Sequence, residues 1–204
     1  MSTSARQLVS WWDEALEALS HEPYFAAARE RTTGCGLLRC RSLFSTYVRA
    51  VCGQQVSTAA AERAARSVFA FAGFDDDRAA EPIARADAQA LRALGLSQTK
   101  AQALSGLACG FVAGPLAREA LARLDDAQVR DRLTALRGVG PWTADMVLIF
   151  GLNRPDVWAR TDFGLRKALE KTGLGQKDSS QWAPWRTAAT WLLWQSLTST
   201  PVQY

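Results

Sequence analysis

The sequence has little of what builds a metal centre or an iron–sulfur cluster. Its four cysteines are Cys35, Cys40, Cys52 and Cys109; no two of them form a CxxC pair, and none follows residue 109. This spacing argues against a zinc site and against a cluster loop near the C-terminus. In a reducing compartment such cysteines are most simply buried thiols. We therefore expect no iron–sulfur cluster and no metal site made by side chains.

Long apolar runs are also missing. The apolar stretches are short and interrupted by arginine, so none has the length that a bilayer span requires. The first residues, MSTSARQLVSWWDEAL, lack the apolar core of a secretory signal peptide. These absences predict a cytoplasmic protein with no membrane partner.

Lysine and histidine are scarce. Lysine occurs only at positions 100, 167, 171 and 177, and His21 is the single histidine. The other basic side chains are arginines, the formal net charge is +4, and the sequence pI is about 9.1. Arginine binds phosphate oxygens with two parallel hydrogen bonds, which favours a nucleic-acid partner. A GC-rich genome would produce the same arginine bias, so composition alone leaves the partner open.

Helical periodicity extends over most of the chain, and no strand pair or repeat is visible. The pattern predicts helices at about 42–52 and 56–72. Ser57 is expected to cap the second of them and Gly73 to end it. The acidic segment 74–86 is expected to be a surface connection or the start of a short helix.

The second half of the chain shows the same pattern. Ser97 is expected to cap a helix, and SSQWAPWRTAATWLLWQSL near the C-terminus is expected to form a long helix or a helix pair. The tryptophans of this stretch, expected to be core residues, are Trp182, Trp185, Trp191 and Trp194. We predict an all-α fold of about ten helices in two lobes, 41–151 with six helices and 1–40 with 152–204. A cleft between the lobes would hold the active site.

A glycine turn, LRGVGPWTADMV, occupies residues 136–147. Gly138 and Gly140 permit a tight hairpin with positive φ, and Pro141 suits the first turn of the next helix. Val139 is expected to point inward. The amides of the turn would then face outward at a helix N-terminus, where a phosphate fits. On its own, the motif is also typical of an ordinary connection between two helices.

Five stretches together resemble the helix-hairpin-helix DNA glycosylases. LRGVGPWTA resembles their hairpin, and DVWARTDFGLRK resembles the segment that carries their catalytic aspartate. VRAVCGQQVSTAAA resembles the early helix pair that faces DNA, and GLSQTKAQAL resembles a turn on the phosphate side. PWRTAATWLLW resembles the closing helix of 3-methyladenine DNA glycosylase II. The resemblance spans roughly residues 40–200, in the expected order.

The resemblance implies that Asp162 is the catalytic residue. The reaction would hydrolyse the N-glycosidic bond between a damaged base and deoxyribose, and the carboxylate would stabilise the positive charge that develops on the sugar. The residue pattern also favours Asp162 as the N-cap of the helix FGLRKAL. The two roles are compatible.

Position 142 separates the subclasses of the superfamily. Members with lyase activity carry a nucleophilic lysine directly after the hairpin, whereas this chain has Trp142. Since an indole cannot form a Schiff base, we predict no AP lyase activity. Trp142 would instead lie against a cationic alkylated base, with Phe25, Phe44, Tyr47 and Trp158 as further pocket candidates. A plain core role for Trp142 stays open.

The resemblance also implies that the damaged base is extruded from the DNA stack. This extrusion leaves a gap in the stack that a side chain of the protein would fill. In the family an apolar residue often does this, but the matching position here is Gln55, which departs from that pattern. Gln54 and Gln55 could also be no more than a polar helix cap. The full set of predicted DNA contacts is Gly138, Val139, Gly140, Thr143, Gln54, Gln55, Ser97 and Lys100.

The predicted function is that of a monofunctional glycosylase. It would excise alkylated bases of the 3-methyladenine and 7-methylguanine type from double-stranded DNA in base excision repair, as a monomer. No cofactor is expected, apart from a monovalent cation that the hairpin carbonyls near Gly138 and Val139 could hold. The main alternative is a non-catalytic helix-hairpin-helix DNA-binding repair protein. A mispair or oxidised-base glycosylase is disfavoured by the missing cysteines and lysine, and a helical scaffold does not account for the ordered matches.

Overall fold

The computed structural model describes residues 7–202, and these residues are organised as helices. Within this range the only bridge of β type is an isolated one between Leu8 and Leu38. The predicted all-α class is therefore confirmed. The described part of the chain contains twelve α-helices, against about ten expected.

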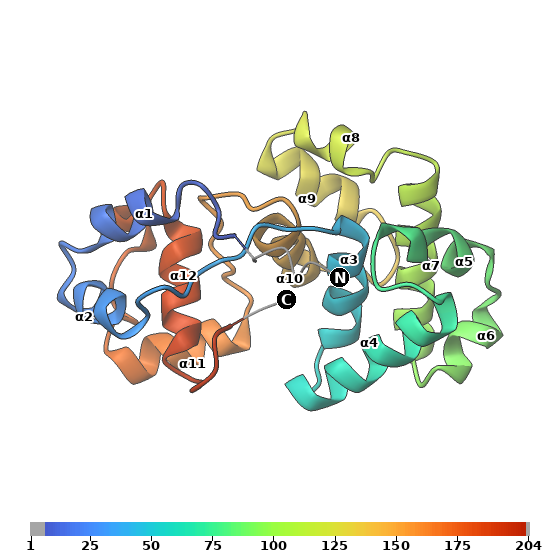
Figure 1. The fold of residues 1–204 in the computed structure, drawn as a ribbon, viewed down its shortest axis with the longest axis horizontal. Coiled ribbons are helices and arrows are strands. Elements are labelled where there is room, and N and C mark those ends of the chain that lie inside the picture. The colour runs from blue at the N-terminus through green and yellow to red at the C-terminus, as the bar shows by residue number, and fades with distance from the viewer. Residues whose placement is uncertain (1–6, 203–204) are drawn as a thin grey trace. The chain divides into compact units, whose positions relative to one another are not determined.

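The α-helices are labelled in Figure 1 where there is room. They are α1 (Trp12–Leu19), α2 (Pro23–Arg31), α3 (Leu43–Gly53), α4 (Thr58–Ala72), α5 (Ala80–Arg85), α6 (Ala88–Ala93), α7 (Gln98–Val112), α8 (Arg118–Ala122), α9 (Asp126–Thr134), α10 (Pro141–Met146), α11 (Phe163–Thr172) and α12 (Arg186–Gln195). Two 3₁₀ turns, η1 (Asp77–Ala79) and η3 (Ser179–Trp182), and a π-helical turn, η2 (Val147–Gly151), accompany them. None of the helices within residues 7–202 has both the length and the apolar character needed to span a bilayer.

The chain divides into two compact units. Unit 1 consists of Met1–Arg39 together with Asn153–Tyr204, and unit 2 is the continuous segment Cys40–Leu152. The ends of unit 1, residues 1–6 and 203–204, lie outside the described range. Unit 2 is thus inserted into the chain of unit 1.

The first two helices of unit 2 follow from local sequence. Helix α3 packs against α4, α7, α10 and η2, and most of its side chains are buried. The side chain of Ser57 caps α4 by accepting the N–H of Ala60, and Gly73 ends it in a left-handed conformation with φ 74°. Both predicted boundary residues are confirmed.

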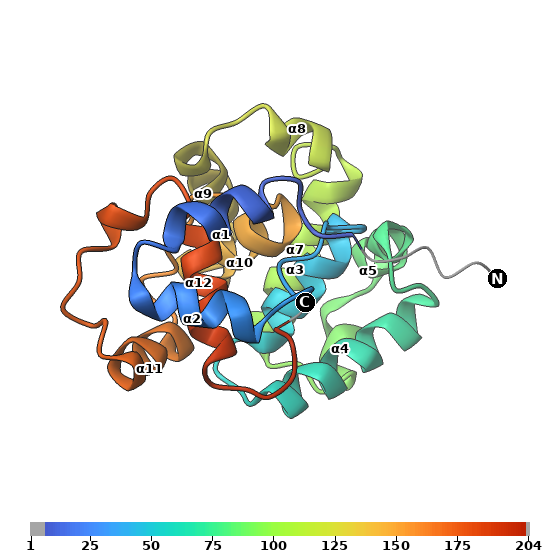
Figure 2. The same ribbon diagram turned by 60° about the vertical axis from the view of Figure 1, so that its left-hand side comes forward.

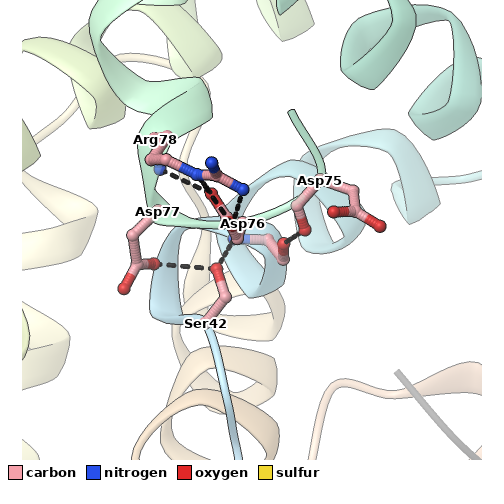
Figure 3. Close-up of polar contacts among 6 residues, drawn as sticks. Ser42, Asp75, Asp76, Asp77 and Arg78 are labelled. Atoms are coloured by element: carbon pink, nitrogen blue, oxygen red, sulfur yellow. Dashed lines mark hydrogen bonds and ion pairs between the residues drawn. The ribbon is translucent and has the colours of Figure 1, made fainter. Parts of the chain in front are cut away.

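The acidic segment after α4 stabilises the start of α3 (Figure 3). Asp77 Oδ1 accepts hydrogen bonds from Ser42 Oγ and from the N–H of Phe44, each at 2.8 Å. Ser42 Oγ in turn accepts the N–H of Ser45 at 3.0 Å, and Asp76 pairs with Arg78. Of the two alternatives for this segment, a surface connection or the start of a short helix, the second is confirmed: it forms η1 and α5, and it also caps the buried helix α3.

The core of unit 1 is aromatic, and Figures 1 and 2 both show α1, α2 and α12 gathered in this unit. Trp12 meets Trp191 edge to face at 5.2 Å, and Phe25 meets Trp182 in the same way at 5.3 Å. Such pairs contribute beyond their area of burial. The predicted core role is confirmed for Trp182 and Trp191.

The other two tryptophans of the C-terminal stretch differ from the expectation. Trp185 is half-buried and stacks on Trp11 at 5.9 Å. Trp194 is also half-buried, and its indole donates a hydrogen bond to a carboxylate. The apolar pattern could not distinguish a tryptophan that packs on all sides from one that offers its N–H to a partner.

Candidate active site

The glycine turn of unit 2 has the predicted hairpin form. The N–H of Val139 donates to Leu136 O at 3.1 Å, and Gly138 adopts φ 83°. A Cβ at Gly138 would lie 2.7 Å from Thr99 O, so a side chain there would collide with the backbone of α7. Gly140 needs no positive φ: it is the N-cap of α10 in an extended conformation with φ −99°. Only one of the two glycines thus has the positive φ that we expected.

The side chain of Val139 is buried, with 5% of its surface exposed. Any contact of this residue with DNA would therefore come from its backbone. The two helices that flank the turn are joined by an ion pair, in which Arg130 Nε lies 2.8 Å from Asp145 Oδ1. Burial raises the pKa of Asp145, while Arg130 opposes that shift. The ion pair fixes α9 against α10.

Two residues that we predicted to contact DNA, Gln54 and Thr143, are hydrogen-bonded to each other. Gln54 Nε2 lies 2.9 Å from Thr143 Oγ1 and also 2.9 Å from Gly138 O. Thr143 is almost fully buried, with 1% exposed. The structure therefore brings Gln54, Thr143 and the hairpin together, with the hydroxyl of Thr143 turned to the protein interior.

Two further predicted contacts lie at the N-terminus of α7. Ser97 is exposed and its side chain caps the helix by accepting the N–H of Lys100 at 3.3 Å. Lys100 is half-buried, and its ammonium donates to Cys52 O at 2.9 Å. Partial burial lowers the pKa of Lys100, and burial raises the pKa of the Cys52 thiol to about 11. Lys100 therefore links α7 to the last turn of α3.

Gln55 stands in the loop between α3 and α4. It is exposed and has φ 53°, a left-handed conformation that is uncommon for a residue with a side chain. Val56 beside it is 46% exposed. The loop thus presents one polar and one apolar side chain to solvent.

The pocket candidates of unit 2 lie in different surroundings. Trp142 is half-buried in the first turn of α10. Phe44 and Tyr47 of α3 have no exposed surface: Phe44 packs on Phe111 at 5.4 Å, and Tyr47 Oη donates to Leu116 O at 2.8 Å. Burial raises the pKa of Tyr47 far above its usual range. The structure places these two rings in the core of unit 2, and their contacts there explain them without a bound base.

Asp162 lies in unit 1 as the N-cap of α11. Its Oδ1 accepts the N–H of Leu165 at 2.5 Å and the indole N–H of Trp194 at 2.8 Å. The carboxylate is buried, with 9% exposed. A Cβ at Gly164 would lie 3.1 Å from Asp162 Oδ1, so glycine leaves room for this oxygen. The predicted capping role of Asp162 is confirmed.

Trp194 is the site residue that sequence reasoning missed. It is near the end of α12, and α12 packs against α11, whose N-cap is Asp162. The available signal was its position in the closing helix, three residues after Trp191. That position predicts a core role for both tryptophans and does not distinguish Trp194 from Trp191.

The segment that leads to Asp162 is tied to the start of α12. Thr187 Oγ1, which is fully buried, accepts the N–H of Val157 at 2.9 Å and donates to Arg154 O at 2.7 Å. Asp156 pairs with Arg186 through two hydrogen bonds of 2.6 and 2.8 Å. Trp158, the pocket candidate of this segment, is half-buried and lies against Trp182 at 5.4 Å. Helix α12 therefore binds both the chain segment that precedes Asp162 and the carboxylate of Asp162 itself.

Within the described residues, no group of three or more His, Cys, Asp or Glu side chains could hold a metal ion. All four cysteines carry free thiols, but the expectation of buried thiols holds for Cys52 alone, since Cys35 and Cys40 are half-buried and Cys109 is exposed. Unit 1 thus offers the carboxylate of Asp162, which accepts an indole and a backbone N–H, and unit 2 offers a glycine turn at the start of a helix.

Residues 48–182 match the model of a family described as "HhH-GPD superfamily base excision DNA repair protein". The chain is 33% identical over 198 residues to the "Probable bifunctional transcriptional activator/DNA repair enzyme AlkA" of Mycobacterium tuberculosis, a match that covers 89% of this chain. It covers 39% of that protein, so the chain spans about two fifths of this relative's length.

Two further comparisons cover a larger share of the similar protein. The chain is 32% identical over 163 residues to "DNA-3-methyladenine glycosylase 1" of Schizosaccharomyces pombe, a match that covers 75% of this chain and 72% of that protein. The structure of the S. pombe 3-methyladenine DNA glycosylase Mag1 in complex with abasic DNA is similar, with a TM-score of 0.76 and 27% identity. The similarity covers 94% of this chain and all of that one.

Proposed function

From the premise that this chain belongs to the HhH-GPD superfamily of base excision DNA repair proteins, we propose that it is a DNA glycosylase that excises alkylated bases. The substrate would be double-stranded DNA that contains bases of the 3-methyladenine or 7-methylguanine type. The names of the relatives support this substrate class. The observation that carries the proposal is the buried, doubly hydrogen-bonded carboxylate of Asp162.

The chemistry assigned to Asp162 is electrostatic. When the bond between base and sugar breaks, positive charge develops at C1′ of the deoxyribose. A carboxylate that is already fixed stabilises that charge without a reorganisation cost. The cap bond from Leu165 and the bond from Trp194 fix the rotamer of Asp162 before substrate binds. The same carboxylate would orient the attacking water.

Trp142 defines the second part of the proposal. The side chain directly after the hairpin is an indole, which cannot attack C1′ to form a Schiff base, so the product would be an intact strand with an abasic site. The face of an aromatic ring attracts the positive charge of an alkylated base, by about 0.5–2 kcal/mol. Trp142 and Trp158 are the half-buried tryptophans that we propose for this contact.

The hairpin and its neighbours are proposed to bind the DNA backbone. The amides of Gly138, Val139 and Gly140 precede α10, and Ser97 starts α7; both positions suit phosphate oxygens. Gln55 is proposed to fill the gap that the extruded nucleotide leaves. The protein would act as a monomer, and a monovalent cation at the hairpin carbonyls near Gly138 and Val139 is the only ion that we propose.

The test is incubation of the protein with methylated duplex DNA, with base release and strand nicking scored separately. We expect release of free base and no nicking until the abasic sites are cleaved by alkali. Asp162→Asn retains a side-chain oxygen that can cap α11 but removes the charge, so it should slow release by about a hundredfold or more. Its affinity for undamaged duplex should stay at the wild-type level.

Two results would count against the proposal. Release by Asp162→Asn at the wild-type rate would remove the catalytic role of the carboxylate. DNA binding by the wild type without release of any alkylated base would leave only a binding function.

A further inference from the structure

The side chain of Gln54 is hydrogen-bonded within unit 2, to the glycine turn and to the helix that follows it. Its Nε2 has two acceptors at 2.9 Å, Gly138 O and Thr143 Oγ1. A primary amide nitrogen carries two hydrogens, so these two bonds use both of its donors. The amide nitrogen of Gln54 therefore has no further N–H to donate once it has bonded to Gly138 and Thr143.

A second link secures the same turn of α3. Lys100 Nζ donates to Cys52 O at 2.9 Å, two residues before Gln54. The neighbour of Lys100, Thr99, packs against the hairpin, since a Cβ at Gly138 would lie 2.7 Å from Thr99 O. The last turn of α3, the start of α7 and the hairpin are thus joined pairwise.

The residue after Gln54 depends on this arrangement. Gln55 has φ 53°, although it carries a side chain, and it is exposed. Such a conformation is strained for a residue with a Cβ and persists only where its surroundings determine it. The hydrogen bonds of Gln54 and Lys100 fix the backbone directly before Gln55.

On the basis of the proposed function, we infer that Gln54 is a positioning residue that couples Gln55 to the phosphate-binding hairpin and does not itself contact DNA. Gly138, whose carbonyl accepts the bond from Gln54, belongs to the turn that would bind a phosphate. Gln55, which follows Gln54, would fill the gap in the base stack. Binding of the backbone at the hairpin therefore orients the gap-filling side chain through one amide group.

The test compares Gln54→Leu, Gln55→Ala and the double variant in the full chain. Gln89→Leu, which replaces an exposed glutamine of α6, is the matched control. Hydrogen exchange of the hairpin amides is measured in the free protein. Single-turnover release of 7-methylguanine is measured at saturating protein concentration.

Gln54→Leu removes both donors and leaves two acceptors unpaired. We expect it to accelerate exchange of the hairpin amides by about tenfold and to slow base release by a similar factor. Gln55→Ala should slow release when Gln54 is present but have little further effect in the Gln54→Leu background. Such non-additivity would show that the two residues act as one unit. Gln89→Leu should change neither quantity.

Thr143→Val is the second variant, in case Gln54→Leu does not fold. It removes one of the two acceptors and should accelerate hairpin exchange by a smaller factor. Unchanged hairpin exchange in these variants, or additive effects of the Gln54 and Gln55 substitutions on release, would overturn the inference. If the wild type releases no base, the proposed function fails, and hairpin exchange in the free protein alone decides the role of Gln54.

Discussion

At the scale of single residues, two of the donors that bind the Asp162 carboxylate are neutral groups. Its Oδ1 accepts hydrogen bonds from an indole N–H and a backbone N–H. An arginine in the place of Trp194 would fix the carboxylate equally well but would also neutralise it. In the proposed function, a neutral donor such as the Trp194 indole would fix the rotamer of Asp162 without cancelling the negative charge that is to act on a cationic sugar.

Replacement of Trp194 by phenylalanine tests this argument. The variant keeps an aromatic ring on α12 but loses the N–H that lies 2.8 Å from Asp162 Oδ1. We expect single-turnover base release to slow by about ten- to a hundredfold, since a hydrogen bond to a charged group contributes roughly 1.5–3 kcal/mol. Affinity for undamaged duplex should not change. Trp185→Phe, which alters a half-buried tryptophan stacked on Trp11, is the control and should release base at nearly the wild-type rate.

Residue-scale contacts could be predicted from the sequence where they are local. Ser57, Ser97 and Asp162 each cap a helix by accepting the N–H three residues on, and such bonds follow from residue type and position. The bonds from Gln54 to Thr143, from Lys100 to Cys52 and from Trp194 to Asp162 span 89, 48 and 32 positions. Such pairs cannot be predicted from a local sequence pattern, because they depend on how the helices pack.

At the scale of elements, α12 organises the segment that leads to Asp162. Thr187 is fully buried and bonds to Val157 N–H and Arg154 O, whereas Thr190 is equally buried and its Oγ1 has no hydrogen-bond partner among the described residues. Thr187→Val should lower the free energy of unfolding by about 1–3 kcal/mol, because it removes the hydrogen bonds that the buried hydroxyl makes to Val157 N–H and Arg154 O.

Thr190→Val is the matched variant on the same helix. It removes a buried hydroxyl that has no hydrogen-bond partner among the described residues. The substitution should therefore leave the free energy of unfolding unchanged or raise it. Urea denaturation of both variants measures the difference. Equal destabilisation by the two substitutions would show that the hydroxyl of Thr187 does not hold the segment.

The ion pair at the start of α12 makes a pH-dependent contribution. The hydrogen bonds and charge of Arg186 lower the pKa of Asp156 in the folded protein. A lowered folded-state pKa stabilises the fold above the unfolded pKa of about 4 and loses that contribution as pH falls toward the lower folded value. The difference in unfolding free energy between wild type and Asp156→Asn should therefore be full at pH 7 and shrink below about pH 4. A difference that stays constant down to pH 3 would contradict this.

At the scale of the whole molecule, the residues to which we assign the proposed function are divided between the two units of the chain. Unit 2 carries the hairpin, Gln54 and Gln55, whereas unit 1 carries Asp162 and Trp194. Amphipathic patterns predict that the helices exist, but they do not determine which helices share a core. The order of the five motifs along the chain was the feature of the sequence that related these residues to one function.

This division predicts that binding and chemistry respond differently to salt. The chain has a net charge of +4, and we propose that its hairpin binds phosphates. Its affinity for undamaged duplex should therefore fall by about ten- to a hundredfold between 50 and 200 mM salt. The single-turnover rate at saturating protein should change by less than about twofold, because Asp162 is buried and its hydrogen bonds are poorly screened. Asp162→Asn should show the wild-type salt slope for binding, since Asp162 is not among the proposed phosphate contacts. A release rate that fell in parallel with affinity, at protein concentrations that keep the DNA saturated, would mean that the carboxylate acts through the phosphate contacts rather than on the sugar.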